Sequence, residues 1–296
     1  MPTKEAVKTS ILSTRWKNIW ASIPTIDFDD DLLDAMKVDD DSHCPDVTSF
    51  MNFVERVLRL RDASNMKKFC LSYEDYAEKL FSGCSVLENL VLSDCMWMHV
   101  EDIVISISTL KSLTIDDQSF LDPFDDFNGC KIRIDAPNLT YFEYIGFLSN
   151  EILLSNVPSL VKACIHISLP CERQKIVACR AIDLLKPLQY VMSLRLSNCT
   201  IEGFEHSVNL GENDRVWLLI PICVSNCLKT VTFKNFHAND SELCFLKHVL
   251  KYARVLERMN ICWSKTPLRG QKKQTKVMKE LETIERSSIA CVVKFS

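Results

Sequence analysis

The side chains best suited to bind a calcium ion are the carboxylates of an acidic run at residues 27–31, followed by three more aspartates at 39–41. Such closely spaced carboxylates supply the hard oxygen ligands that Ca²⁺ prefers. An EF-hand loop starting at Asp27 would require glycine at its sixth position and glutamate at its twelfth, where the chain has Leu32 and Val38. The run is therefore interpreted as a solvated acidic linker.

Thiols and imidazoles could instead bind zinc, and the candidates are Cys171, Cys179, Cys223, Cys227 and His166. A tetrahedral site usually joins two closely spaced pairs of ligands, and no second pair accompanies Cys223 and Cys227. The fourteen cysteines are spread from Cys44 to Cys291, a pattern typical of buried free thiols in a reducing compartment. We expect no metal and no other cofactor.

Nucleophilic catalysis would require a base close to a serine or cysteine, and the chain contains six histidines. None of them lies in an H-E-x-x-H motif, no serine lies in a G-x-S-x-G motif, and no phosphate-binding loop is present. The sequence therefore favours a protein that is not an enzyme. A thiol hydrolase that uses one of the cysteines is the alternative from another class.

The charge balance and hydropathy restrict the partners and the compartment. Lysine and arginine number 35 against 39 acidic residues, a formal net charge of −4, so no general attraction to nucleic acid or membranes is expected. The first twenty residues lack a secretory apolar segment, and the longest apolar run, 216–224, is interrupted by Pro221. We expect an intracellular protein of the cytoplasm, the nucleus or both.

The basic stretch 265–279 is followed by three glutamates between residues 280 and 285, which partly balance its charge. It is interpreted as a solvated helix face or loop. Docking of an acidic partner on this stretch is the alternative.

These side chains must be positioned by a repeat that runs through most of the chain. The pattern L-x-x-L-x-L, with apolar substitutions, recurs seven times at irregular intervals. Its best copy is 87–92, and its apolar positions are Leu87/Leu90/Leu92, Leu110/Leu113/Ile115, Leu139/Phe142/Tyr144, Leu160/Ala163/Ile165, Val191/Leu194/Leu196, Leu228/Val231/Phe233 and Leu256/Met259/Ile261. We call these residues the template side chains.

The alternation at the end of each copy places two apolar side chains on one face of a short strand. A buried leucine contributes about 1.5–3 kcal/mol, too little to order a repeat of about 25 residues alone, so repeats must stack and share a core. Any single copy could instead mark an amphipathic helix. Seven copies predict an α/β leucine-rich-repeat solenoid, with short parallel strands on its concave face and helices and loops on its convex face.

Residues between the template side chains would face the concave surface, which suits protein recognition. Tyr141, Arg195 and Arg258 are the expected anchors, because tyrosine and arginine dominate interface energetics. The predicted binding strip comprises Asn89, Val91, Ser93, Ser112, Thr114, Asp116, Tyr141, Glu143, Ile145, Lys162, Cys164, His166, Ser193, Arg195, Ser197, Thr230, Thr232, Lys234, Arg258, Asn260 and Cys262.

The N-terminal segment has apolar side chains at helical spacing, with one helix expected over 13–21. Residues 2–20, followed by Ile23-Pro24 and Asp27-Phe28-Asp29, resemble the second half of an F-box. The stretches 53–58, 83–88, 135–139 and 157–161 extend the resemblance to plant F-box proteins with leucine-rich repeats. Residues 227–259 and 291–295 resemble the FBD region of that family.

The resemblance implies a substrate-recognition subunit of an SCF-type ubiquitin ligase, whose F-box binds a Skp-type adaptor and whose repeats hold a target protein. The residues carried over to the adaptor contact are Leu12, Trp16, Ile19 and Trp20. We expect a partial F-box at 1–24, an acidic linker and helix at 25–65, repeats at 66–221 and an FBD-like region at 222–296. A repeat-only interaction scaffold without ligase coupling is the alternative.

Overall fold

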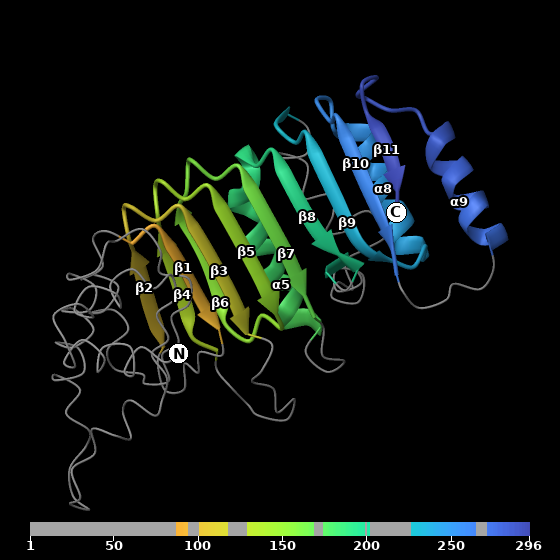
Figure 1. Cartoon of the computed structure of the whole chain (residues 1–296). Helices are drawn as coiled ribbons and strands as arrows, with labels where there is room; N and C mark the ends of the chain where they lie inside the picture. Colours follow the sequence, from red (N-terminus) through yellow and green to blue (C-terminus); the bar gives the residue numbers. More distant parts are fainter. Residues whose placement is uncertain are drawn as a thin grey trace, which may run out of the picture. The chain divides into compact units, whose positions relative to one another are not determined.

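The computed structural model describes residues 87–93, 101–117, 129–168, 174–198, 200–201, 226–264 and 271–296 (Figure 1). The chain divides into two compact units. Unit 1 comprises Met1–Leu139 and Leu153–Val157, and unit 2 comprises Thr140–Ile152 and Pro158–Ser296. The expected partial F-box at 1–24 and the expected linker at 25–65 lie outside the described residues.

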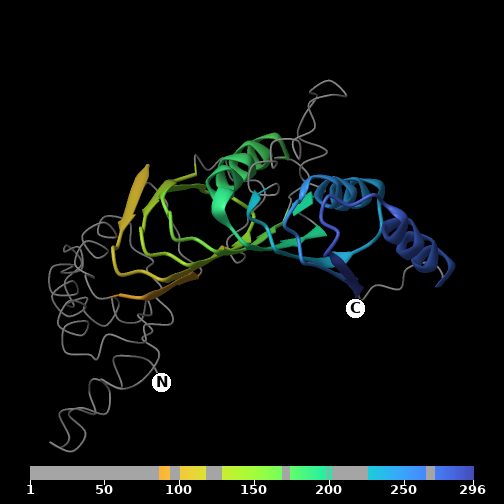
Figure 2. The same ribbon diagram turned by 90° about the horizontal axis from the view of Figure 1, so that it is seen from above.

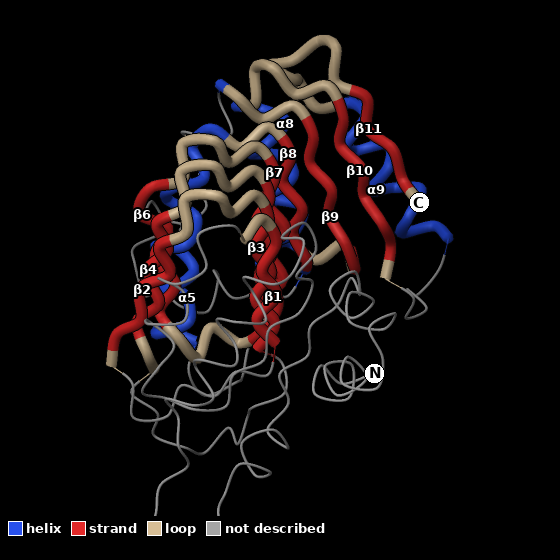
Figure 3. Tube along the Cα trace, turned by 60° about the vertical axis from the view of Figure 1, so that its left-hand side comes forward, coloured by secondary structure: helices blue, strands red, loops and turns tan. Residues whose placement is uncertain are grey.

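Unit 1 is built from two rows of parallel strands. In one row β1 (Asn89–Ser93) pairs with β3 (Ser112–Asp117). In the other, β2 (Asp102–Ser106) pairs with β4 (Lys131–Asp135), and the end of β6 (Glu151–Asn156) follows β4. Figure 3 shows β1 and β3 lying opposite β2 and β4. Alternate side chains of both rows are buried, so the core of the unit lies between them.

Tight turns follow β2 and β4 in unit 1, and a side chain of the second turn contacts the first. The amide of Leu110 donates to the carbonyl of Ile107 at 3.2 Å, closing the turn between β2 and β3. One repeat later, the Asn138 side chain donates to the carbonyl of Ser108 at 2.7 Å. Asn138 follows Pro137 in the sequence, so this proline–asparagine pair occupies a turn, as the repeat pattern predicts.

Unit 2 contains a longer row of strands, and every strand pair in it is parallel. Its order is β5 (Tyr141–Gly146), β7 (Lys162–Ile167), β8 (Ser193–Ser197), β9 (Thr230–Phe236), β10 (Arg258–Trp263) and β11 (Val292–Phe295). Strand β11 is additional to the seven repeats identified in the sequence. It pairs with β10 in the register Met259↔Val293.

Shared main-chain acceptors join each repeat of unit 2 to the next. The carbonyl of Val161 accepts hydrogen bonds from the amides of Met192 at 2.9 Å and Ser193 at 3.0 Å. The same arrangement recurs from β5 to β10, at the carbonyls of Thr140, Met192 and Lys229. Because both partners are main-chain groups, this ladder holds the strands in register whatever the side chains are.

The core of each unit is formed by the template side chains, none of which has more than 4% of its surface exposed. In unit 2 the helices α5 (Gln174–Leu185) and α8 (Asp240–Tyr252) lie on the same side of the strand row (Figure 2). The short helix η3 (Lys186–Tyr190) precedes β8, and α9 (Gln271–Thr283) lies between β10 and β11 in the chain. The other side of the strand row faces away from α5 and α8.

Helix α8 begins at a capping box that uses a buried carboxylate. The side chain of Asn239 accepts a hydrogen bond from the amide of Glu242 at 2.8 Å, and Glu242 accepts from the amide of Asn239 at 3.0 Å. Glu242 is fully buried and also accepts from the amide of His237 at 3.0 Å. The helix then packs Phe245 onto Phe233 of β9, with ring centroids 6.2 Å apart.

The predicted α/β leucine-rich-repeat solenoid is confirmed, with one difference in unit 1. There the elements across the core from β1 and β3 include strands β2 and β4 as well as loops. Alternating apolar residues such as Ile132 and Ile134 fit a strand and not an amphipathic helix. Helices occur where connections are longer, as in residues 168–192 between β7 and β8.

Replacing a core aromatic in unit 2 should be strongly destabilising. Phe233 is fully buried and contacts the rings of Phe236 and Phe245. We expect Phe233→Ala to lower the free energy of unfolding by about 3–5 kcal/mol, because it removes buried surface and leaves a cavity. The exposed control Lys276→Ala should stay within about 0.5 kcal/mol. Urea unfolding followed by circular dichroism measures both, and equal midpoints would show that Phe233 is not part of the core.

Candidate functional site

The face of unit 2 that points away from α5 and α8 is the candidate binding surface. Side chains alternate across a strand, so the residues between buried template side chains emerge on this face. We call it the inner strip of unit 2. Its members from the predicted set are Tyr141, Glu143, Ile145, Lys162, His166, Ser193, Arg195, Thr230, Thr232, Lys234, Arg258, Asn260 and Cys262.

The strand register aligns these side chains in rows. Arg195 of β8 lies opposite Thr232 of β9, which in turn lies opposite Asn260 of β10. The Asn260 amide contacts the Thr232 hydroxyl at 3.4 Å. Neighbouring strands lie about 4.8 Å apart, so each row is continuous from strand to strand.

One end of the inner strip carries a connected polar cluster. The Tyr141 hydroxyl donates to Oε2 of Glu143 at 2.9 Å, and Nζ of Lys162 lies 5.1 Å from the centre of the Tyr141 ring. Burial, followed by the hydrogen bond to Glu143 and its charge, raises the pKa of the Tyr141 phenol above its usual range. Tyr141 is therefore a neutral hydrogen-bond donor at physiological pH.

Cys164 lies opposite both Glu143 and Arg195 in the strand register. Burial, then the hydrogen bond with Glu143 and its negative charge, raise the pKa of the Cys164 thiol to about 11, although the positive charges of Arg195 and Lys234 act in the other direction. The thiol is therefore protonated at neutral pH. This is the opposite of the low thiol pKa that a nucleophilic cysteine requires.

Exposure divides the predicted strip into accessible and inaccessible members. Lys162, Lys234 and Arg258 are exposed. Tyr141, Glu143, His166, Arg195, Thr232 and Asn260 are half-buried. Two members of the predicted strip, Cys164 and Ser197, are buried, and the Ser197 hydroxyl is hydrogen-bonded to the buried Thr200 hydroxyl at 3.0 Å.

Unit 1 carries a second, smaller part of the predicted strip. Asn89 lies opposite Ser112, Val91 opposite Thr114 and Ser93 opposite Asp116. All of these side chains except Ser93, whose exposure is not described, are half-buried. This part has no lysine or arginine, so the basic members of the predicted strip all lie in unit 2.

Sequence reasoning missed one member of the inner strip of unit 2, Lys294 of β11. It is exposed and lies opposite Asn260. The signal was the alternation of Val293 and Phe295 with Lys294 and Ser296, which is typical of a strand. The predicted adaptor-contact residues Leu12, Trp16, Ile19 and Trp20 lie outside the described residues.

The described residues contain no group of three or more His, Cys, Asp or Glu side chains that could hold a metal ion. Of the zinc candidates named above, Cys171 and Cys223 lie outside these residues. In the same described part of the chain, no helix is long and apolar enough to cross a membrane.

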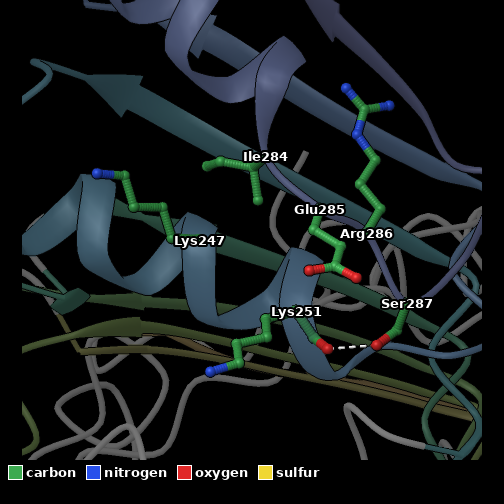
Figure 4. Close-up of a pocket in the computed structure, with 6 residues that line it drawn as sticks. All are labelled: Lys247, Lys251, Ile284, Glu285, Arg286 and Ser287. Carbon is green, nitrogen blue, oxygen red and sulfur yellow. Dashed lines mark hydrogen bonds between the residues drawn. The ribbon is translucent and has the colours of Figure 1, made fainter.

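A cavity of about 450 Å³ lies between α8 and the segment that follows α9 (Figure 4). Several of its polar groups are engaged in contacts with neighbouring segments of the chain. Lys247 pairs with Glu280 at 2.5 Å, and the Ser287 hydroxyl donates to the carbonyl of Lys251. The Arg286 guanidinium points away from the other labelled residues and donates to the carbonyl of Cys291 at 2.8 Å. The cavity therefore presents no convergent set of ligand-binding groups.

Comparison with known proteins gives one family match within the chain. Residues 218–261 match the FBD family model. In the structure the described part of this segment contains β9, α8 and all but the end of β10. The FBD match therefore covers two of the repeats that carry the inner strip. No solved structure is significantly similar to the chain.

Relatives are found among proteins of Arabidopsis thaliana. An F-box/FBD/LRR-repeat protein is 23% identical over 82% of this chain and 67% of its own length. Two F-box/LRR-repeat proteins are 25% and 24% identical, over 70% and 91% of this chain and 60% and 76% of their own lengths. The chain thus spans roughly two thirds of the length of these relatives. Together with the FBD match and the stacked strands, these similarities show that the chain resembles plant F-box/leucine-rich-repeat proteins that carry an FBD region.

Proposed function

We propose that this protein is the substrate-recognition subunit of an SCF-type ubiquitin ligase, acting in the cytoplasm or nucleus. Its leucine-rich repeats bind a target protein through the inner strip of unit 2. Other subunits of the complex carry out ubiquitin transfer. The observation that carries this proposal is the inner strip itself, in which six parallel strands present aligned polar and charged side chains on the face opposite α5 and α8.

The inner strip has the size and composition that a protein partner requires. Six strands at a spacing of about 4.8 Å give a surface about 24 Å wide. Tyr141 and the two arginines, Arg195 and Arg258, are of the residue types that most often contribute binding energy. The main-chain ladder fixes the spacing of these side chains before a partner arrives, which lowers the entropic cost of binding.

The coupling to a ligase is supported by the F-box named in the relatives and by the resemblance of residues 2–20 to part of an F-box. Leu12, Trp16, Ile19 and Trp20 are the proposed contacts with a Skp-type adaptor. Large apolar side chains of this kind bury much surface, and tryptophan is enriched among binding hot spots.

In this proposal the protein itself catalyses no reaction. The buried thiols support this part of the proposal, because burial raises the pKa of Cys130 to about 12 and also raises the pKa of Cys291. These two residues, like Cys164, are therefore poor nucleophiles at neutral pH.

The ligase role can be tested by co-purifying the full chain with a Skp-type adaptor. We expect a stable complex, and we expect Trp16→Ala to weaken it by about thirtyfold or more, because truncating a tryptophan hot spot costs about 2 kcal/mol. Lys276→Ala, an exposed change on α9, is the matched control and should leave binding intact. Failure of the unaltered chain to bind the adaptor would favour the repeat-only scaffold.

The non-catalytic role predicts a specific order of thiol reactivity. At neutral pH an alkylating reagent should label exposed Cys179 faster than Cys130 or Cys164, because burial keeps the latter two protonated and covered. Mass spectrometry of the folded chain over time gives each rate, and the urea-unfolded chain provides the reference. Faster labelling of Cys164 than of Cys179 would contradict the non-catalytic assignment and would revive a thiol-dependent activity.

A further inference from the structure

The inner strip of unit 2 concentrates positive charge on a chain whose formal net charge is −4. Its basic members are Lys162, Arg195, Lys234, Arg258 and Lys294. Glu143 is the one carboxylate among the strip residues defined above, and it already accepts the hydrogen bond of Tyr141. The face is therefore strongly basic even though the whole chain is acidic.

None of these five basic side chains lies within 4.0 Å of a carboxylate among the residues that the structure describes. Elsewhere in unit 2, two exposed lysines do have such partners, whereas Lys276 and Lys279 of α9 have none among the described residues. Lys186 pairs with Asp183 at 2.6 Å, and Lys229, just outside the strip, pairs with Glu257 at 3.3 Å. Five cations without a described carboxylate partner thus lie on the face that is proposed to bind a partner.

The strand register also separates the cations from one another. Lys162 lies opposite Ser193, while Arg258 lies opposite Thr230 and Val292. Arg195 lies on the strand next to that of Lys162, two residues beyond the residue opposite Lys162. This diagonal separation is about 7–8 Å. No two of these cations therefore lie directly opposite each other on neighbouring strands.

This spacing discriminates between possible anions. One phosphate group binds tightly where several donors converge on it within hydrogen-bond distance. Single charges about 7–8 Å apart instead match separate carboxylates, because alternate side chains of an extended peptide lie about 6.6–7 Å apart. Hydroxyl and amide groups between the cations, such as Thr232 and Asn260, can bond to the main chain of such a peptide.

We propose, building on the proposed function, that the inner strip of unit 2 recognises an extended segment of the target protein rich in aspartate and glutamate. Lys162, Arg195 and Lys234 form one diagonal of contacts, and Arg258 and Lys294 form a second. Each cation meets one carboxylate of the segment. The neutral residues between them hold its backbone.

A labelled peptide of alternating glutamate and threonine is the probe, and fluorescence anisotropy with the full chain measures its binding. We expect saturable binding that weakens as salt is raised. The double variant Lys234→Glu/Arg258→Glu should bind about tenfold more weakly or worse, equivalent to about 1.4 kcal/mol. Both residues are exposed, so the variant should keep its fold, which circular dichroism checks. The control Lys276→Glu/Lys279→Glu makes the same charge change on exposed positions of α9 and should bind normally.

Several results would overturn the inference. Equal binding of a glutamine–threonine peptide would show that carboxylates are not recognised, and an equal loss in the α9 control would show that only net charge matters. Tighter binding of a singly phosphorylated peptide would assign the strip to phosphate, and tighter binding of a single-stranded oligonucleotide would assign it to nucleic acid. A chain that binds the Skp-type adaptor but not the acidic peptide overturns this inference alone. A chain that binds the peptide but not the adaptor overturns the ligase role alone.

Discussion

The rest of the structure depends on the inability of any one repeat to bury its own apolar side chains. A strand such as β8 covers Leu194 and Leu196 only because β7 and β9 lie against it and α5 and α8 close the same side. The shared carbonyl acceptors then fix the position of each strand relative to the strand of the preceding repeat. The free energy of stacking is thus common to the whole unit, as in other quasi-one-dimensional folds.

This constraint separates the residues that fold the protein from those that can bind. Positions that face the core must be apolar, and the template side chains occupy them throughout both units. The positions of the inner strip contribute little to the core, so they can carry charges such as those of Lys234 and Arg258 without loss of packing. The main-chain ladder does not depend on these side chains, which leaves the inner strip free to specify a partner.

The seven template strands could be predicted because period-two alternation with a leading leucine is a local signal. The repeat pattern did not predict strand β11, because the residue in the leading leucine position is Cys291. Cys291 lies one position closer to its strand than the leucines of the other repeats do. Strands β2 and β4 lack the leading leucine altogether. The pairing of charges could not be predicted, because adjacent residues behave differently: Glu257 forms an ion pair with Lys229, whereas neighbouring Arg258 has no carboxylate partner among the described residues.

Hydrogen exchange of the shared-acceptor amides is the most direct test of the central claim that stacking holds unit 2 together. The amides of Lys162, Ser193, Thr230 and Arg258 each donate to the carbonyl of the preceding repeat. If stacking holds unit 2 together, all four amides exchange through a common opening, at least about a hundredfold more slowly than the amide of Ile289, whose side chain is fully exposed. Exchange of any of these four amides as fast as that of Ile289 would contradict that claim.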